Sequence, residues 1–348
     1  MTTVDDAPGT LYDPEGKPTS LVLPEHIEKD KRLATPPTAQ KPTSSTIGTQ
    51  TPTHMVAPLW HTTAADDAID LAELCGLNML PWQQLVLRNA LGERRGGKWS
   101  AFEVGLVLPR QNGKNVIVLA RELAGLFLFG EEQQVHTAHK FKTARSAHRE
   151  LVKTIQRVPD LHDLVQSMPT STDNTAVVLK DGRRCDFLAR QNGGGRGLSG
   201  DLVILDEAFQ ISTELVSDLL PTLSARPAPQ VWYTSSAGMD SSDVLENLRN
   251  RALKAPEKEK FLTYLEWSAD IDRYAWDSEV ACQQANPSLG YFQDWDWISV
   301  LSLRPWTKSA TSVSAWACGP IRPVVRPLAL RRGSGRRLRP MTLPAMRW

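Results

Sequence analysis

The 348-residue sequence predicts an α/β fold built on a doubly wound, mainly parallel sheet. Apolar runs of strand length alternate with helical patterns between about residues 102 and 234. One of these runs, residues 202–205, is entirely apolar, as expected of a central parallel strand that is covered on both faces. Composition agrees, because 41% apolar and 23% charged residues are enough to bury a sizeable core.

The predicted elements follow in order along the chain. Two helices come first, at residues 66–77 and 82–91, and Pro81 suits the first turn of the second one. A strand at 102–108, a polar turn and a long apolar helix at 115–129 then form the opening of a nucleotide-binding unit. The remaining elements are a strand at 135–138, a helix at 142–157, a hairpin of 177–179 with 185–188, and strands at 202–205 and 231–234.

The turn after the strand at 102–108 has the residues of a phosphate-binding loop. Backbone N–H groups at a helix start, together with a lysine, bind phosphate. The usual pattern is Gly-x4-Gly-Lys-Ser/Thr, but here Leu108 replaces the first glycine and Asn115 the hydroxyl residue. A Gly-Lys pair alone is most often just a turn. The candidate nucleotide-binding residues are Arg110, Gln111, Asn112, Gly113, Lys114 and Asn115.

Two adjacent carboxylates strengthen this interpretation. Asp206 and Glu207 follow the apolar run 202–205, where the first can hold Mg²⁺ and the second can polarise the attacking water. A helix cap would explain one acid but not the pair. Lys114 would then contact the β- and γ-phosphates, and the Asn115 amide would lie near the metal. Together these elements predict a P-loop NTPase of the RecA/ASCE-like kind that hydrolyses ATP or GTP with Mg²⁺.

Three further segments fit a nucleotide site, and each has a plainer alternative. Gln83 can read the edge of an adenine base, or it can belong to an ordinary amphipathic helix. Arg196 lies in the glycine-rich loop 193–197 and can neutralise phosphoryl charge, or it can be a solvated side chain. Residues 234–236 are small hydroxyl residues at a strand end, which can sense the γ-phosphate or form a simple turn.

The ends of the chain differ from its middle. Residues 1–58 are rich in Pro and Thr and are predicted to be a disordered arm. No acid follows Asp296, whereas the tail carries Lys308 and nine arginines. All 39 acids and the other 30 of the 40 bases precede the tail, so the body carries about −9 and the tail +10. No apolar stretch is long enough to span a bilayer, and the four scattered cysteines form no metal pattern.

In this order and spacing, the motifs resemble those of the large terminase subunit, the DNA-packaging ATPase of tailed double-stranded DNA phages. The resemblance covers about residues 59–293, and a P-loop without its first glycine is typical of that family. The matching runs are Pro81-Trp82-Gln83, Pro109-Arg110-Gln111-Asn112-Gly113-Lys114, Gly195-Arg196-Gly197, Leu205-Asp206-Glu207-Ala208 and Thr234-Ser235-Ser236.

The resemblance implies a role for each residue of the nucleotide site. Gln83 matches the adenine-reading glutamine of the family. Lys114 matches its Walker A lysine, and Arg110 matches the extra basic residue of its P-loop. Asp206 and Glu207 match the Walker B magnesium ligand and the catalytic base.

The resemblance also implies partners. Arg196 matches an arginine that reaches the ATP of a neighbouring subunit, and Thr234, Ser235 and Ser236 match a coupling motif. The family works as a homo-oligomeric ring, here expected to be a pentamer, on the portal protein of the prohead. It acts with a small terminase subunit and threads double-stranded DNA. This implies a protein of the host cytoplasm that docks transiently on the portal, is absent from the mature virion and contacts no membrane.

The C-terminal part departs from the family, which continues into an RNase H-like nuclease with clustered carboxylates. We therefore expect an ATPase domain at 59–295 and a basic tail at 296–348 without nuclease activity. The Arg/Pro/Ser-rich tail suggests a frameshift near residues 297–304, and the alternative is a genuine DNA-binding tail. Two other functions stay open. One is a RecA-like helicase-type DNA translocase, which needs a second RecA-like domain. The other is an inactive terminase remnant that only binds portal or DNA.

Overall fold

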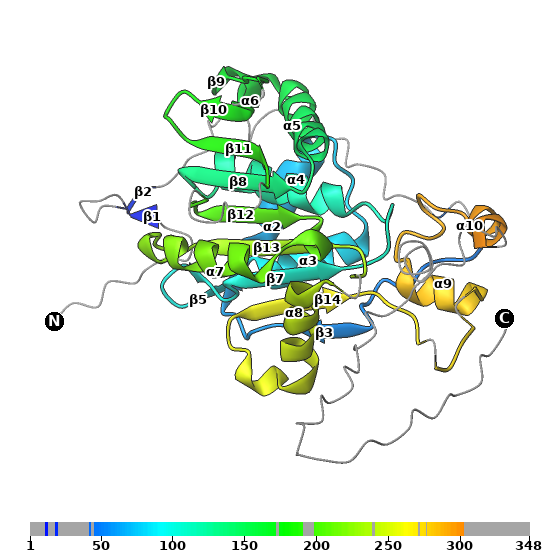
Figure 1. Cartoon of the computed structure of the whole chain (residues 1–348). Helices are drawn as coiled ribbons and strands as arrows, with labels where there is room; N and C mark the ends of the chain where they lie inside the picture. Colours follow the sequence, from blue (N-terminus) through cyan, green and yellow to red (C-terminus); the bar gives the residue numbers. More distant parts are fainter. Residues whose placement is uncertain are drawn as a thin grey trace, which may run out of the picture.

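The computed structural model describes residues 45–302, except 172–173, 191–197, 239–240, 271 and 276, together with 11–12, 18–19 and 42. A nine-stranded sheet forms its centre in the order β3-β14-β7-β13-β12-β8-β11-β10-β9 (Figure 1). Its strands are β3 (His54–Val56), β7 (Glu103–Val107), β8 (Gln133–Ala138), β9 (Val165–Ser167), β10 (Ala176–Leu179), β11 (Arg184–Ala189), β12 (Leu202–Asp206), β13 (Gln230–Ser235) and β14 (Leu262–Glu266). Two small antiparallel sheets contain β1 (Leu11–Tyr12) with β2 (Pro18–Thr19), and β4 (Thr62–Thr63), β5 (Gly92–Arg94) and β6 (Lys98–Trp99).

Helices cover both faces of the large sheet. In Figure 1, α7 and α8 lie in front of it, while α2, α3 and α4 lie behind it. The α-helices are α2 (Ala65–Leu74), α3 (Pro81–Ala90), α4 (Lys114–Phe127), α5 (Phe141–Gln156), α6 (Pro159–Asp163), α7 (Thr213–Thr222), α8 (Asp243–Lys254), α9 (Glu279–Ala285) and α10 (Trp295–Ser302). Short 3₁₀ turns are η2 (Ala208–Gln210), η3 (Leu223–Ala225) and η4 (Pro256–Lys258).

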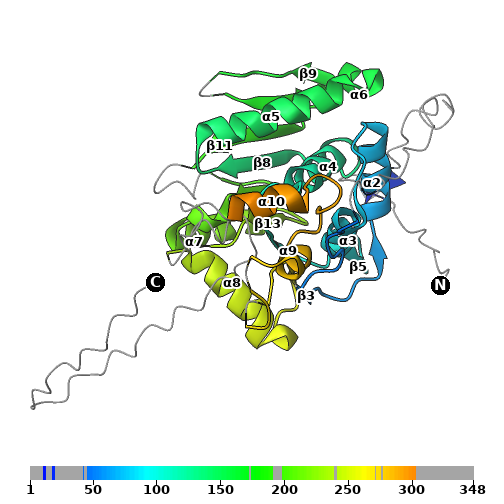
Figure 2. The same cartoon turned by 90° about the vertical axis from the view of Figure 1, so that its right-hand side faces the viewer.

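The six strands from β14 to β11 in the sheet order run parallel to one another. Their carboxyl ends therefore meet at one edge, which we call the carboxyl edge. Figure 2 looks toward this edge, with α9 and α10 in front of it. The strands β3, β9 and β10 are antiparallel to their neighbours. This confirms the predicted α/β fold with a doubly wound, mainly parallel sheet.

Burial explains why the central elements form. All five residues of β7 and all six of β13 are buried, as are the four apolar residues of β12. Helix α4 is buried from Ile117 to Phe127, because it packs against the sheet on one side and against α2 on the other. The apolar pattern of these segments is therefore that of a covered parallel sheet.

The structure extends the domain beyond both predicted boundaries. Residues 54–56, assigned from the sequence to a disordered arm, form β3 and pair with β14, and Trp267 Nε1 donates to Thr49 O at 3.0 Å. Helix α10 crosses the predicted boundary at residue 296. Alternation also continues past residue 240, since α8 leads into β14 beside β7. The predicted tail from residue 303 onward lies outside the described residues.

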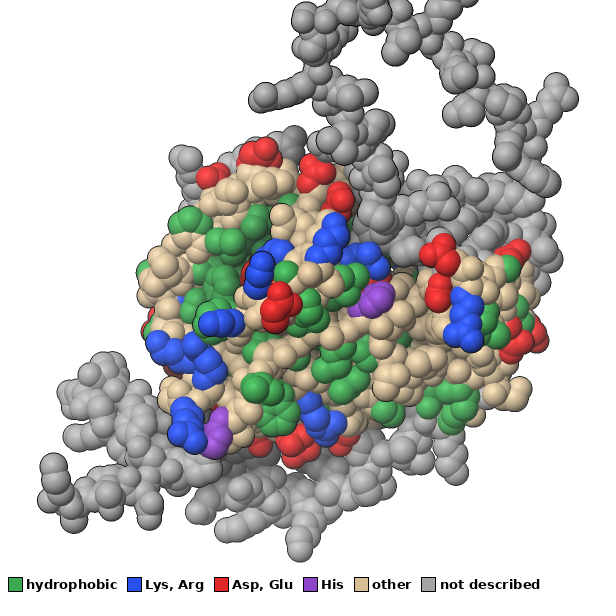
Figure 3. All heavy atoms as spheres, turned by 90° about the horizontal axis from the view of Figure 1, so that it is seen from below, with side chains coloured by type: hydrophobic (Ala, Val, Ile, Leu, Met, Phe, Trp, Pro, Cys, Tyr) green, Lys and Arg blue, Asp and Glu red, His purple; other side chains and the backbone are tan. Residues whose placement is uncertain are grey.

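The underside of the molecule, below α8 and β3 in Figure 1, has a mixed surface. Lys and Arg side chains are interspersed there with Asp, Glu and apolar patches (Figure 3). Large exposed apolar side chains on the described residues include Leu59 at 97% and Trp297 at 65%. Within the described part of the chain, no helix has both the length and the apolar character needed to cross a membrane.

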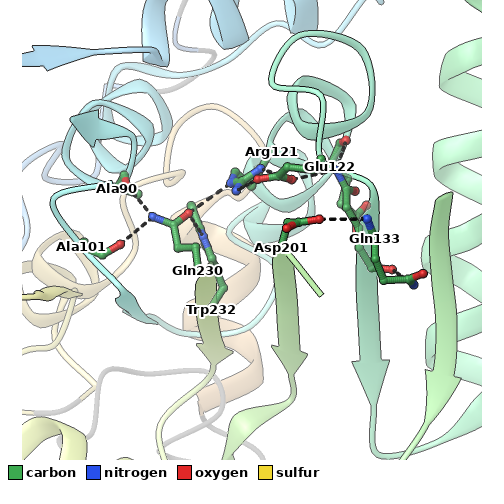
Figure 4. A network of polar contacts seen from close by, with 10 residues as sticks. Ala90, Ala101, Arg121, Glu122, Gln133, Asp201, Gln230 and Trp232 are labelled. Atoms are coloured by element: carbon green, nitrogen blue, oxygen red, sulfur yellow. Dashed lines mark hydrogen bonds and ion pairs between the residues drawn. The ribbon is translucent and has the colours of Figure 1, made fainter. Parts of the chain in front are cut away.

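A buried polar network ties α4 to the sheet (Figure 4). Arg121, which interrupts the apolar pattern of α4, forms a bidentate ion pair with Glu131 and donates from Nε to Gln230 Oε1 at 3.2 Å. Gln230 in turn donates to Ala90 O and Ala101 O at 2.8 and 3.0 Å. Because every charge here is paired, the arginine can be buried without an unpaired cation.

A glycine makes room for this network. A Cβ added at Gly125 would lie 2.0 Å from Gln134 Nε2 and 2.1 Å from Glu131 Oε2. No side chain fits in that space. The close approach of α4 to the polar groups at the start of β8 therefore requires glycine at this position.

Candidate nucleotide-binding site

The predicted phosphate-binding loop joins β7 to α4 at the carboxyl edge. Lys114 is the first residue of α4, and Gly113 before it has φ +83°, a conformation that side chains rarely adopt. A Cβ at Gly113 would also lie 3.0 Å from Gln83 Nε2. Arg110 and Gln111 are exposed, as is Asn115 in the first turn. The N–H groups and positive dipole at the α4 N-terminus make this loop suited to an anion.

The Asn112 side chain anchors this loop from inside. It is fully buried, its Nδ2 donates to Asn286 Oδ1 at 2.8 Å, and its Oδ1 accepts from Ser288 N at 3.1 Å. Ser288 Oγ also donates to Asn112 O at 2.7 Å. The predicted nucleotide-binding role of Asn112 can therefore involve its backbone, while its side chain fixes the loop.

Gln83 lies directly beside the loop. Its Oε1 accepts from Leu80 N at 2.8 Å, and its Nε2 donates to Gly113 O at 3.0 Å. The side chain is fully buried. A glutamine amide has a second donor hydrogen and a second lone pair, so these two bonds leave capacity for another partner. Reading of adenine by Gln83 stays a prediction.

The predicted Walker B acids end β12 two strands away from β7. Asp206 is the last residue of that strand, and Glu207 follows it with φ +53° and ψ +48°. This left-handed conformation costs a non-glycine residue roughly 1–3 kcal/mol, so the surroundings must impose it. Gln111 in the phosphate loop has φ +62°. Among the described residues, these two are the only non-glycine residues with positive φ, and both lie at this site.

Thr234 and Ser235 tie the end of β13 to these acids. Thr234 pairs in register with Asp206, and its Oγ1 donates to Asp206 Oδ1 at 2.7 Å. Ser235 Oγ accepts from Phe209 N at 3.1 Å, just after the acidic pair. Ser236, the third predicted residue, is buried at the end of the strand. The hydroxyls therefore fix one carboxylate oxygen and the turn that follows it.

Electrostatics connect the phosphate loop with the acidic pair. Burial lowers the pKa of Lys114 below its ordinary value, while the nearby Asp206 carboxylate opposes this shift. Arg110 lowers the pKa further, and Glu207 opposes it. The lysine of one predicted motif and both acids of the other thus share one electrostatic environment at the carboxyl edge.

Several residues of the site were not found from the sequence. Asn286 and Ser288 lie more than 170 positions from Asn112, so no local pattern connects them. Arg190 follows β11 and donates from Nη2 to Glu207 O at 3.2 Å. Arg196, which the sequence did single out, lies outside the described residues.

The fold resembles that of solved phage proteins. The crystal structure of the HK97 bacteriophage large terminase matches with a TM-score of 0.62 and 19% sequence identity, over 73% of this chain and 55% of that one. The Thermus phage P74-26 large terminase ATPase domain matches with a TM-score of 0.37 and 18% identity, over 51% of this chain and 72% of that one. The large terminase of the thermophilic bacteriophage D6E in complex with ADP matches with a TM-score of 0.40 and 13% identity, over 58% of this chain and 44% of that one.

The HK97 likeness shows a shared fold, and this chain spans about half the length of the HK97 protein. No protein-family profile and no curated protein sequence matches this chain.

Proposed function

We propose that this chain is the ATP-hydrolysing motor domain of a phage large terminase, which drives double-stranded DNA into a prohead. The observation that carries the proposal is the convergence of Lys114, Asp206 and Glu207 at the carboxyl edge, with Thr234 fixing Asp206. Open parallel sheets bind ligands at this edge. The shared fold with the HK97 large terminase supports the same conclusion.

The arrangement suits Mg-ATP. Lys114 and the N–H groups at the start of α4 would hold the β- and γ-phosphates. Asp206 is partly exposed and uses one oxygen for Thr234, so its other oxygen can serve Mg²⁺. Asn115, in the first turn of α4, would supply its amide oxygen. Mg²⁺, when bound, supplies positive charge beside the phosphate oxygens.

In this proposal Glu207 activates the water for the hydrolysis step. Its carboxylate accepts a proton as the water oxygen attacks the γ-phosphorus, and the bond to the β-phosphate oxygen breaks to release ADP and phosphate. Thr234 connects Asp206 to β13, and Ser235 connects the turn after the acidic pair to the same strand. A change at the γ-phosphate can therefore be transmitted through these hydroxyls to the rest of the sheet.

The wider proposal concerns assembly. We propose a homo-oligomeric, pentameric ring on the portal protein, working with a small terminase subunit in the host cytoplasm, in which Arg196 reaches the ATP of the adjacent subunit. The basic charge of the sequence after Asp296 suits contact with the DNA backbone. The underside seen in Figure 3 bears both signs of charge on its described residues, so it offers no uniformly basic surface to DNA there.

The decisive experiment measures ATP hydrolysis by purified protein with and without double-stranded DNA. We expect turnover that Lys114→Ala and Glu207→Gln each reduce at least about 100-fold, because they remove the phosphate-binding cation and the base. Glu214→Gln makes the same chemical change at an exposed position of α7 and should leave turnover unchanged.

An inert wild-type protein would favour a remnant that binds portal or DNA without turnover. ATP-driven displacement of a triplex-forming strand from double-stranded DNA would test translocation separately. Hydrolysis without displacement would leave an ATPase but contradict the motor.

A further inference from the structure

Arg190 spans three strand ends at the carboxyl edge. It directly follows β11, and its N–H donates to Ala138 O at the end of β8 at 2.9 Å. Its guanidinium donates from Nη1 to Thr137 O and Oγ1 at 3.0 and 3.2 Å, and from Nη2 to Glu207 O at 3.2 Å. Since β8 lies between β11 and β12 in the sheet, this one side chain crosses β8 to reach the acidic pair.

The atom that Arg190 holds belongs to a strained residue. Glu207 has the left-handed backbone conformation described above, and its carbonyl accepts from both Gln210 N at 3.1 Å and Arg190 Nη2. A non-glycine residue keeps such a conformation only when its surroundings impose it. Arg190 provides one of the contacts that impose it, and it comes from a different strand than the acidic pair.

The charge of Arg190 also faces this pair. Burial lowers the pKa of Arg190 to about 10, opposed by the Asp206 and Glu207 carboxylates, so the side chain stays charged at neutral pH. Its Nε is buried and has no acceptor among the residues that the structure describes. The charged groups near it are Asp206 and Glu207, on β12 and its following turn, and His136 on β8. A partly buried cation in this position costs stability, so its location points to a role at the site.

We propose that Arg190 is a positioning residue for Glu207: by holding the Glu207 carbonyl, it fixes the direction in which the carboxylate points at the attacking water. This inference rests on the proposed ATPase function and deepens it. Arg190 acts within its own subunit, in contrast to the role proposed for Arg196. Its contribution should appear in the chemical step and leave nucleotide binding to the phosphate loop.

The first test compares Arg190→Ala with Arg184→Ala. Arg184 lies at the other end of β11, pairs with Asp186 and is 39% exposed, so it is a matched control. We expect Arg190→Ala to lower kcat about 10- to 100-fold, with the Kd for ATP changed less than about threefold. The kcat of Arg190→Lys should lie between those of Arg190→Ala and the wild type, because lysine restores the charge without the two donor groups of the guanidinium. Arg184→Ala should match the wild type. If the alanine variant does not fold, Arg190→Lys and Arg190→Gln are compared instead.

The second test asks whether Arg190 acts through Glu207. Single-turnover rates of Glu207→Gln and of Glu207→Gln/Arg190→Ala should agree within about twofold, because the second change removes support for a base already lost. The proposal would be overturned if the rate losses of the two changes multiplied in the double variant. It would also be overturned if Arg190→Ala were as active as the wild type, or if its Kd for ATP weakened in proportion to its loss of kcat/KM. A wild-type protein without turnover would instead overturn the proposed function, and this inference with it.

Discussion

Single residues at the site are held in conformations that cost free energy. Gln111 and Glu207 both have positive φ without being glycine, and each lies in a predicted nucleotide-binding motif. Strain of this kind usually persists where function requires a fixed geometry. His136 on β8 and Glu122 on α4 form a buried titratable pair, in which burial of charge costs free energy and the pairing offsets this cost.

The His136–Glu122 pair makes stability depend on pH. Burial would lower the pKa of His136, but the charge of Glu122 and its hydrogen bond to Nδ1 at 2.6 Å outweigh burial and raise it. The folded protein therefore binds this proton more tightly than the unfolded chain. The resulting stability is fully present below the unfolded pKa of about 6.5 and is lost as pH rises through the raised folded pKa.

Glu122→Gln should consequently lower stability by roughly 1–3 kcal/mol near pH 6 and by less near pH 9. Thermal unfolding of both proteins across this range measures the difference. Glu150→Gln, which breaks an exposed pair with Lys153, is the control and should show a small, pH-independent change. A deficit for Glu122→Gln that is equal at both pH values would contradict the assigned charge state of His136.

Residues within one local motif could be predicted, and residues brought in by the fold could not. Lys114 and the Asp206–Glu207 pair stand out because a strand, a turn and a helix surround them in sequence. Arg190 and Ser288 carry no such signal, since their partners come from other strands or from more than 170 positions away. Periodicity reports which face of an element is buried, but it does not report what lies opposite.

At the scale of elements, the segment from α9 to α10 acts as a brace for the phosphate loop. Ser288 is fully buried, donates to Asn112 O at 2.7 Å and accepts from Trp82 Nε1 at 3.1 Å. Farther on, Gln293 Nε2 donates to Arg110 O at 3.2 Å. Trp82 precedes Gln83 on α3, so this brace joins the phosphate loop to the helix that carries Gln83.

Ser288→Ala should loosen that brace. Loss of the hydroxyl leaves Trp82 Nε1 and Asn112 O without this partner, which costs about 1–3 kcal/mol of stability. A less well fixed loop should also weaken ATP binding by about 3- to 10-fold, because binding must then restore its order. Thermal unfolding and titration with a fluorescent ATP analogue measure the two effects. Ser224→Ala removes an exposed hydroxyl that donates to Pro221 O and serves as the control. Equal results for the two variants would exclude the brace.

Long periodic elements were predicted closely, whereas short strands at the sheet edge were not. The predicted helix at 142–157 is α5 (Phe141–Gln156), and the hairpin is β10 with β11 around Gly182 at φ +96°. In contrast, β3 has three residues and forms through pairing with β14, which lies about 200 positions later. The predicted disordered arm, residues 1–58, therefore included residues that belong to the sheet. A strand of that length has no periodicity to detect, so its formation depends on the partner strand.

At the scale of the whole molecule, six strand ends, the phosphate loop and α9–α10 share one edge (Figure 2). Such an edge can meet a neighbouring copy in a ring, where each site receives groups from the adjacent subunit. The predicted trans role of Arg196 requires this arrangement. It also makes the activity of a mixed ring depend on which neighbours meet.

Mixing Arg196→Ala with Glu207→Gln protein in equal amounts tests that dependence. Each variant alone should be nearly inactive, one lacking the arginine and the other the base. In random mixed rings, about one site in four combines an intact Glu207 with an intact neighbouring Arg196, so turnover should approach roughly a quarter of the wild-type rate. The control mixes Lys114→Ala with Glu207→Gln. In that mixture every subunit lacks a group of its own nucleotide site, so no neighbour can restore turnover. An Arg196→Ala mixture as inactive as this control, under conditions where the wild type turns over, would place the arginine in its own site and remove the need for a ring in catalysis.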